Sequence, residues 1–151
     1  MEEDERSSIE KVRGVLVRIL FVILSVGMGY LFAYQWGFLP NGYEWIGEQS
    51  STITIQKNDL YGLKDKELDI SFEEDESFKM SRLRDQVEGQ FLHYFFFFST
   101  AFVMIFSFLQ DRFIDEPLKK GQLFGALFTL FMAWVNVAMQ LSQISEMVSG
   151  G

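Results

Sequence analysis

The sequence predicts an all-α integral membrane protein with three transmembrane helices and a small extracytoplasmic loop that contains a β-hairpin. Three windows, each longer than 20 residues, contain no Asp, Glu, Lys or Arg: 19–43, 89–110 and 121–145. A bilayer core about 30 Å thick is crossed by about 20 helical residues. Nearly all of the charged residues lie outside the three windows, which is typical of proteins that cross a membrane.

A soluble helical bundle is the alternative, and the second window argues against it. Each helix of a soluble bundle needs a polar face toward water. Between residues 91 and 109 the non-apolar side chains are too few to form one: His93, Ser99, Thr100 and Ser107. The phenylalanine run 95–98 surrounds the helix instead of lining one side, which favours contact with lipid, bulky pigments or apolar neighbouring helices.

The first element is a transmembrane helix predicted over residues 15–39. The polar residues 1–14 are expected to form a cytoplasmic N-terminal segment, with Ser7 or Ser8 as a helix cap. The Pro-Asn-Gly sequence at 40–42 is expected to end the helix. Because the start is acidic and the apolar stretch is longer than that of a signal peptide, we expect this segment to remain as an anchor.

Residues 40–88 are predicted to form the extracytoplasmic loop, with a β-hairpin over 51–72 and a helical run-in over 77–88. Polar and apolar residues alternate in two segments, 51–56 and 67–72. Within each segment the apolar residues share one face: Ile53, Ile55, Leu68, Ile70 and Phe72. A lone hairpin is marginally stable in water, so this one is expected to pair or pack with another element.

The second and third transmembrane helices are predicted over residues 89–110 and 121–145. The connection at 111–120 is short and contains Pro117, which prevents a continuous helix. The two helices are therefore expected to form an antiparallel pair joined by a cytoplasmic turn. The remaining residues, 146–151, are expected to form an extracytoplasmic tail.

The positions of Lys and Arg predict the orientation, since both are more frequent in cytoplasmic segments. They occur before or at the start of the first span and between the second and third: Arg6, Lys11, Arg13, Arg18, Arg112, Lys119 and Lys120. The tail has none, so we expect a cytoplasmic N-terminus and an extracytoplasmic C-terminus in an inner or plasma membrane. Six further Lys and Arg residues in the loop oppose this assignment, although acidic residues outnumber them there.

His93 is the one histidine in the sequence and the one candidate cofactor ligand. It lies about one turn inside the second span, where a histidine can serve as an axial ligand of haem or chlorophyll or as a proton relay. The alternative is an interfacial histidine bonded to water, a lipid headgroup or a partner chain. A bis-histidine haem needs a second histidine, so any cofactor would be shared with another subunit, and the sequence itself requires none.

Small residues recur four apart on two spans, a pattern that lets helix backbones approach closely. Ser25, Gly29 and Ala33 form one such row in the first span. Gly121 and Gly125 form a GxxxG pair at the start of the third span, although Gly121 can equally belong to the preceding turn. These five residues are predicted to lie at helix interfaces.

Asn136 and Gln140 are two amides that share one face of the third span. Polar side chains in lipid usually bond across helices, so we favour an interhelical contact over a substrate path. No charged residue lies in the middle of any predicted span. That pattern argues against an ion or proton pump that acts alone.

The acidic run at 65–76 loosely matches a calcium-binding loop, with acids at positions 1, 3, 5, 9 and 12. However, Ile70 occupies the sixth position, where the sharp turn needs glycine. A strand with alternating acids is therefore the preferred interpretation. The chain has no cysteine, which excludes disulfides and thiolate sites, and its net charge of −8 argues against a nucleic-acid partner.

These patterns favour an accessory or structural subunit of a larger membrane complex that contacts other integral membrane subunits and lipids. The complex can be respiratory, photosynthetic, transporting, secretory or motor. We expect the chain not to be an enzyme, since no motif or catalytic spacing is present.

Two other functions stay open. A self-assembling channel or hole-forming protein would be similar in size and number of spans to three-span phage holins, whose usual topology is the opposite and whose C-termini are strongly charged. Its pore would need a polar stripe, for which the spans offer Asn136, Gln140 and scattered Ser and Thr. A membrane enzyme acting on lipid or quinone would need a reactive constellation that the sequence does not indicate.

Overall fold

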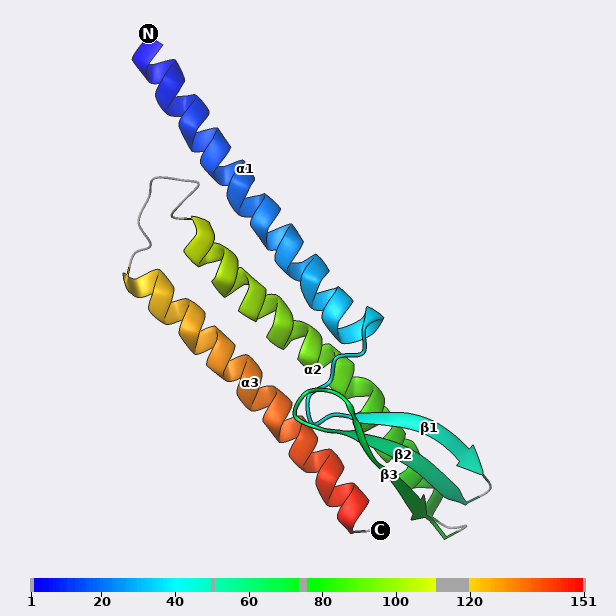
Figure 1. Ribbon diagram of the computed structural model, residues 1–151. Helices are drawn as coiled ribbons and strands as arrows, with labels where there is room; N and C mark the ends of the chain where they lie inside the picture. Colours follow the sequence, from blue (N-terminus) through cyan, green and yellow to red (C-terminus); the bar gives the residue numbers. More distant parts are fainter. Residues whose placement is uncertain (1, 50, 74–75, 111–119, 151) are drawn as a thin grey trace.

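The computed structural model describes residues 2–49, 51–73, 76–110 and 120–150, with side chains from residue 6 onward. Its elements, in chain order, are α1 (Glu2–Tyr30), η1 (Leu31–Gln35), β1 (Tyr43–Gln49), β2 (Thr52–Asn58), β3 (Lys64–Ser71), α2 (Ser77–Gln110) and α3 (Lys120–Ser149) (Figure 1). Three helical segments are long and apolar enough to cross a membrane: Arg6–Gln35, Ser77–Gln110 and Lys120–Ser149. The prediction of a mostly helical chain with three such helices and a small β-structured loop is confirmed.

The central helix is α2, which contacts α1 on one side and α3 on another (Figure 1). The N-terminus lies at one end of the bundle, whereas the sheet and the C-terminus lie at the other. At 1.5 Å per residue, the 34 residues of α2 extend for about 50 Å, more than the thickness of a bilayer core. α2 is therefore longer than a bilayer core requires, and its first turns, where the run-in at 77–88 was expected, carry the sheet.

Two helices are longer than the sequence predicted. The first begins at Glu2, before the expected caps Ser7 and Ser8, because its Glu-rich start has good helix propensity and places acids near the helix N-terminus. The third continues to Ser149, so most of the expected tail is its last turn. Met147 in that turn packs against the sheet core, which explains the continuation. The expected turn at 111–119 lies outside the described residues.

Helical structure in the first span ends at Gln35, earlier than the predicted residue 39, through the π-helical turn η1. The wider turn is visible in the bond from the Phe38 N–H to the Phe32 carbonyl oxygen, 2.9 Å. Gly37 has a φ of +58°, a left-handed conformation that ends many helices because glycine has no Cβ to clash. Gly37 therefore ends the helix before the Pro-Asn-Gly sequence is reached.

The loop folds into an antiparallel sheet of three strands in the order β1-β2-β3. The predicted hairpin is present as β2 and β3, with Ile53 opposite Ile70. The additional strand is β1, which the sequence pattern did not indicate. An irregularity in pairing between Trp45 and Gly47 interrupts its alternation, so the period-2 signal was lost.

The apolar face of the sheet packs against the helices, which supplies the partner that a lone hairpin needs. The buried residues of this cluster come from all three strands and from α2 and α3: Tyr43, Ile53, Ile55, Ile70, Leu83, Val87 and Ile144. Full burial of an isoleucine or leucine side chain stabilises by about 1.5 to 3 kcal/mol. The cluster therefore fixes the sheet to the start of α2 and the end of α3.

A second buried cluster joins the helices beneath the sheet. Its buried members are Ala33, Leu39, Tyr94, Phe98 and Val137. Aromatic rings surround it, and the Phe32 ring lies 5.5 Å from that of Phe98 between centroids. In the phenylalanine run, Phe98 packs into this cluster whereas Phe96 is 55% exposed, so the run does surround the helix.

Candidate functional site

The sheet and the helices meet at a group of buried and half-buried amide and hydroxyl contacts, which we call the junction: Gln86, Gln90, Tyr94, Gln140 and the backbone of Pro40 and Tyr43. Gln90 is fully buried on α2. The Tyr43 N–H donates to Gln90 Oε1 at 3.0 Å, and Gln90 Nε2 donates to the Tyr43 carbonyl oxygen. The side chain of Gln90 thus pairs with the first residue of β1 as a neighbouring strand would.

Tyr94, one turn further along α2, holds the segment that leaves η1. Its ring is buried and lies 6.0 Å from the Phe98 ring, stacked. Its hydroxyl donates to the Pro40 carbonyl oxygen. A buried phenol hydroxyl needs an acceptor, and Pro40 provides one. The exit of the chain from the first span is therefore fixed to α2.

Gln140 connects α3 to α2, whereas Asn136 faces away. Gln140 Nε2 donates to the Gln86 carbonyl oxygen at 3.0 Å and to Gln86 Oε1 at 2.6 Å. Asn136 is exposed, and its Nδ2 donates to the carbonyl oxygen of Met132 in its own helix at 3.0 Å. The two amides that share one face in the sequence therefore have different environments.

His93 lies half-buried on α2 between Gln90 and Tyr94. Its Nδ1 is 3.1 Å from the Gly89 carbonyl oxygen, and because a carbonyl oxygen only accepts, Nδ1 carries the proton. Nε2 is then the acceptor nitrogen of the ring. Across the described residues, no group of three His, Cys, Asp or Glu side chains is placed to hold a metal ion. An axial-ligand role for His93 stays a prediction.

The small residues of the first span lie where α1 and η1 pack on α2. Ser25, Gly29 and Ala33 are all buried, and Ser25 Oγ donates to the Phe21 carbonyl oxygen at 2.7 Å. A Cβ on Gly29 would lie only 2.8 Å from the Ser99 backbone nitrogen. The two helix backbones approach so closely at this point that a side chain does not fit.

Gly121 and Gly125 lie on open surface, and no atom of the described chain comes within 4 Å of a Cβ built on either. Thr129 and Asn136 are exposed on the same side of α3. At 3.6 residues per turn the four fall within about 80° of the helix circumference. We call Gly121, Gly125, Thr129 and Asn136 the α3 stripe. It is a row of small and polar residues that α1 and α2 do not cover, and the exposed side chains of Met132 and Met139 lie among them.

A cleft of about 630 Å³ opens between the end of β3, the first turns of α2 and the last turn of α3. Its lining mixes apolar, amide and charged side chains: Ser71, Phe72, Glu76, Phe78, Lys79, Arg82, Leu83, Gln86, Gln143, Glu146, Met147 and Gly150. Gln86 also accepts from Gln140, so the wall of the cleft is connected to the junction.

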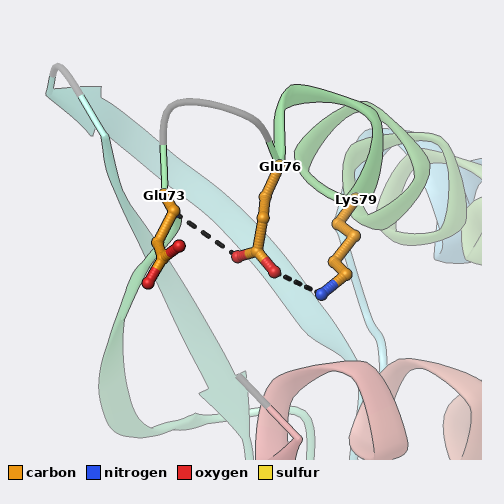
Figure 2. A network of polar contacts seen from close by, with 3 residues as sticks. All are labelled: Glu73, Glu76 and Lys79. Atoms are coloured by element: carbon orange, nitrogen blue, oxygen red, sulfur yellow. Dashed lines mark hydrogen bonds and ion pairs between the residues drawn. The ribbon is translucent and has the colours of Figure 1, made fainter.

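Figure 2 shows the polar contacts at the rim of this cleft. Glu76 forms an ion pair with Lys79 and accepts from the Glu73 N–H at 3.4 Å. Hydrogen bonds from Lys79 and then from Glu73 lower the pKa of Glu76 below its usual value. These contacts hold the first turn of α2, where a carboxylate also meets the favourable end of the helix dipole.

The acidic run at 65–76 is extended over most of its length, because residues 65–71 belong to β3. Asp69 Oδ1 accepts from Thr54 Oγ1 on β2 at 2.6 Å. A calcium loop must curl around its ion, whereas these acids are spread along an edge strand. Charged residues on an edge strand discourage pairing with other chains. The strand interpretation is confirmed, and residues 74–75 lie outside the described part of the chain.

Gln90 and Tyr94 were not singled out by the sequence pattern. Both lie at the predicted membrane boundary, where amides and tyrosines are ordinary interfacial residues. The one available signal was the position of Gln90 one turn before Tyr94 on the same side of a helix. Their partners, Tyr43 and Pro40, are backbone groups 47 and 54 residues away, respectively, which no local pattern can reveal.

The chain matches no protein-family model, no curated protein and no solved structure. Its function is therefore inferred from the geometry. Within the described residues, the junction groups are amides, a phenol and backbone carbonyls, and what they do is hold three helices and a sheet in one arrangement.

Proposed function

We propose that the chain is an accessory, structural subunit of a larger membrane complex, and that the α3 stripe binds a transmembrane helix of a neighbouring subunit. The observation that supports this most directly is Asn136, an exposed amide close to the middle of α3. An amide facing hydrocarbon is unfavourable, and polar groups within spans usually face other helices. A partner helix would give Asn136 a second hydrogen-bond partner.

The surface around Asn136 fits a helix better than it fits lipid chains. Gly121 and Gly125 leave the side of α3 flat, which allows a close approach of a second backbone. Aromatic side chains occupy other parts of the α3 surface, and Phe128, Phe131 and Trp134 are each more than half exposed, whereas the exposed apolar residues within the stripe are the flexible Met132 and Met139. That bulky surface suits lipid, whereas the α3 stripe suits a protein.

In this proposal the N-terminus lies in the cytoplasm and the sheet lies on the outer side of an inner or plasma membrane. Lys and Arg residues near the N-terminus and between α2 and α3 support this orientation. The sheet would then be available to extracytoplasmic parts of the complex.

A self-assembling channel is the second candidate function. The observation in its favour is that Thr129, Asn136 and Gln143 are exposed at seven-residue intervals, so they repeat on one side of α3. Copies of the chain that met along this side would form a polar seam. The seam would conduct only if the helices surrounded a space filled with water.

The test is purification of the tagged protein from its native membrane in mild detergent, with mass spectrometry and an absorption spectrum of the intact particle. Larger subunits in fixed stoichiometry are expected. A homo-oligomer without partners would contradict the accessory role and favour the channel. A haem or pigment band would assign a cofactor to the complex and make His93 the first residue to substitute.

Two variants test the α3 stripe itself. Gly125→Leu and Asn136→Leu should abolish the co-purification of partners, because one fills the flat surface and the other removes the amide. Ala138→Leu is the matched control, since Ala138 is exposed on the opposite flank of α3. Equal loss of partners in all three variants would mean that the stripe is not the contact.

A further inference from the structure

The turn between β2 and β3 lies at the end of the sheet nearer the membrane helices (Figure 1). The Asn41 N–H donates to the Asp59 carbonyl oxygen at 2.7 Å, and a Cβ on Gly62 would stand 2.9 Å from the Phe38 ring. The turn therefore touches the segment through which the chain leaves the first span. Because Tyr94 bonds that same segment, the turn lies at the level where α2 enters its apolar region.

This turn has a fixed shape, because Asp59 closes it from within. Asp59 Oδ1 accepts from the N–H groups of Tyr61 and Leu63, both at 2.8 Å. The Asp59 N–H donates to the Leu63 carbonyl oxygen at 2.7 Å, and Gly62 supplies the positive φ of +72°. The side chains of the turn are therefore held in place before they meet any partner.

Three large apolar side chains project from this rigid turn: Leu60, Tyr61 and Leu63 are 65%, 72% and 65% exposed, respectively. We call these three residues the apolar turn. Trp36, at the end of the first span, is also 62% exposed. Trp and Tyr are enriched where a bilayer meets water. The other end of the sheet has polar residues such as Gln49 and Ser51, so the apolar side chains gather at the membrane end.

Three lysines lie directly behind the apolar turn. Lys57 and Lys66 stand opposite each other on β2 and β3, and Lys64 follows the turn. Like charges placed opposite each other repel, and in the part of the chain that the structure describes none of the three forms an ion pair. Asp65 and Glu67 alternate with these lysines and so face the other side of β3. Lys57 lies over the Tyr43 ring, 5.9 Å from its centroid, and no described carboxylate neutralises the positive charge on this side.

We propose that the apolar turn inserts into the interface of the same bilayer that the helices cross, and that Lys57, Lys64 and Lys66 bind phosphates of anionic lipids. Apolar side chains would enter the boundary between headgroups and acyl chains, and each nearby lysine would add attraction to anionic lipid. The sheet would then rest on the membrane through a second contact. This inference does not depend on the proposed accessory role.

The chain has no cysteine, so a single fluorophore can be placed at will. The labelled variants are Tyr61→Cys, in the apolar turn, and Ser51→Cys, an exposed position at the other end of the sheet. The full chain is reconstituted in phosphatidylcholine vesicles whose lipids carry bromine near the carbonyl end of the acyl chain. We expect bromine to quench the label at 61 several-fold more than the label at 51, and phosphatidylglycerol to increase that difference.

Iodide in the buffer quenches labels that are exposed to water, so it complements quenching by bromine in the lipid. If iodide reaches both labels equally, the turn lies in water and the proposal is wrong. If neither bromine nor iodide reaches the label at 61, protein covers the turn, and the lipid assignment is overturned in favour of another subunit or a second copy.

The lysines are tested by the double variant Lys57→Gln and Lys66→Gln on the Tyr61→Cys background, with Lys79→Gln as a charge control far from the turn. The double variant should remove the effect of phosphatidylglycerol and leave quenching in neutral lipid. An unchanged response to phosphatidylglycerol in the double variant would overturn the part of the proposal that concerns lipid phosphates.

Discussion

At the scale of single residues, the buried side chain of Gln90 joins the sheet to the membrane helices. Its amide satisfies both the N–H and the carbonyl oxygen of Tyr43. Gln90→Leu keeps most of the volume and removes these bonds. Because each of the two buried backbone groups left without a partner costs about 1 to 3 kcal/mol, we expect the free energy of unfolding to fall by about 2 to 6 kcal/mol.

This loss can be measured by denaturation in detergent micelles, with Trp45 fluorescence as a reporter on β1 in a background in which Trp36 and Trp134 are replaced by Phe. Gln143→Leu is the control, since Gln143 is an exposed amide on α3. A similar effect of both substitutions would show that the contact between Gln90 and Tyr43 contributes nothing specific.

Two glycines on one helix give a second prediction at this scale. A methyl group on Gly29 would press on Ser99, whereas one on Gly27 meets nothing within 4 Å. Gly29→Ala should therefore destabilise the packing of α1 on α2 by about 1 to 3 kcal/mol. Gly27→Ala should leave stability unchanged or raise it slightly, because alanine favours helix. Helix content followed by circular dichroism during denaturation distinguishes the two, and a reversed order would contradict the close approach.

These residues also show what the sequence could reveal. Ser25, Gly29 and Ala33 repeat at an interval of four, so their shared face is visible in a single segment. Gln90 has no such signal, because its partner is a backbone group 47 residues away. Contacts between an interfacial side chain and a distant backbone depend on the whole fold, and composition does not encode them locally.

At the scale of elements, the sequence predicted the strands in which polar and apolar residues alternate regularly. It missed the strand in which that alternation is interrupted. The alternation in β2 and β3 revealed both strands and their buried faces. The irregular pairing between Trp45 and Gly47 hid β1, and the positive φ of Gly37 ended the first span before residue 39. Gly37 is one of several glycines in apolar surroundings, and the sequence does not indicate which of them adopts the left-handed conformation.

The start of α2 should depend on pH through Glu76. Because hydrogen bonds from Lys79 and Glu73 lower its pKa, ionised Glu76 stabilises this turn at pH values above the ordinary carboxyl range. The stabilisation should be lost as the pH falls through the lowered pKa. Nuclear magnetic resonance of the Glu73 amide can follow the titration. In Glu76→Gln the part of the shift that follows the lowered pKa of Glu76 should be absent, and its persistence there would assign the effect to another group.

At the scale of the whole molecule, three long charge-free windows were enough to predict the three helices. They do not determine the rotation of each helix, which decides that Gln140 reaches α2 whereas Asn136 does not. The packing of the sheet on α2 and α3 could likewise not be predicted from the sequence, since it joins residues from every part of the loop and from two helices.

The orientation in the membrane gives a prediction at this scale. Single-cysteine variants Ser8→Cys and Gly150→Cys place a thiol at opposite ends of the bundle in an otherwise cysteine-free chain. In intact cells, a maleimide that does not cross membranes should label position 150 and should label position 8 only after permeabilisation. The inverse pattern would place the sheet in the cytoplasm.

The continuity of α2 has a mechanical consequence. The helix is one unbroken rod of 34 residues, and the sheet is attached to its N-terminal end. A rod about 50 Å long that changes its tilt by about 10° swings its far end by roughly 9 Å. Because helices tilt to match their apolar length to the local hydrocarbon, a thinner or thicker membrane would displace the sheet sideways. A change in bilayer thickness would in this way move the sheet parallel to the membrane.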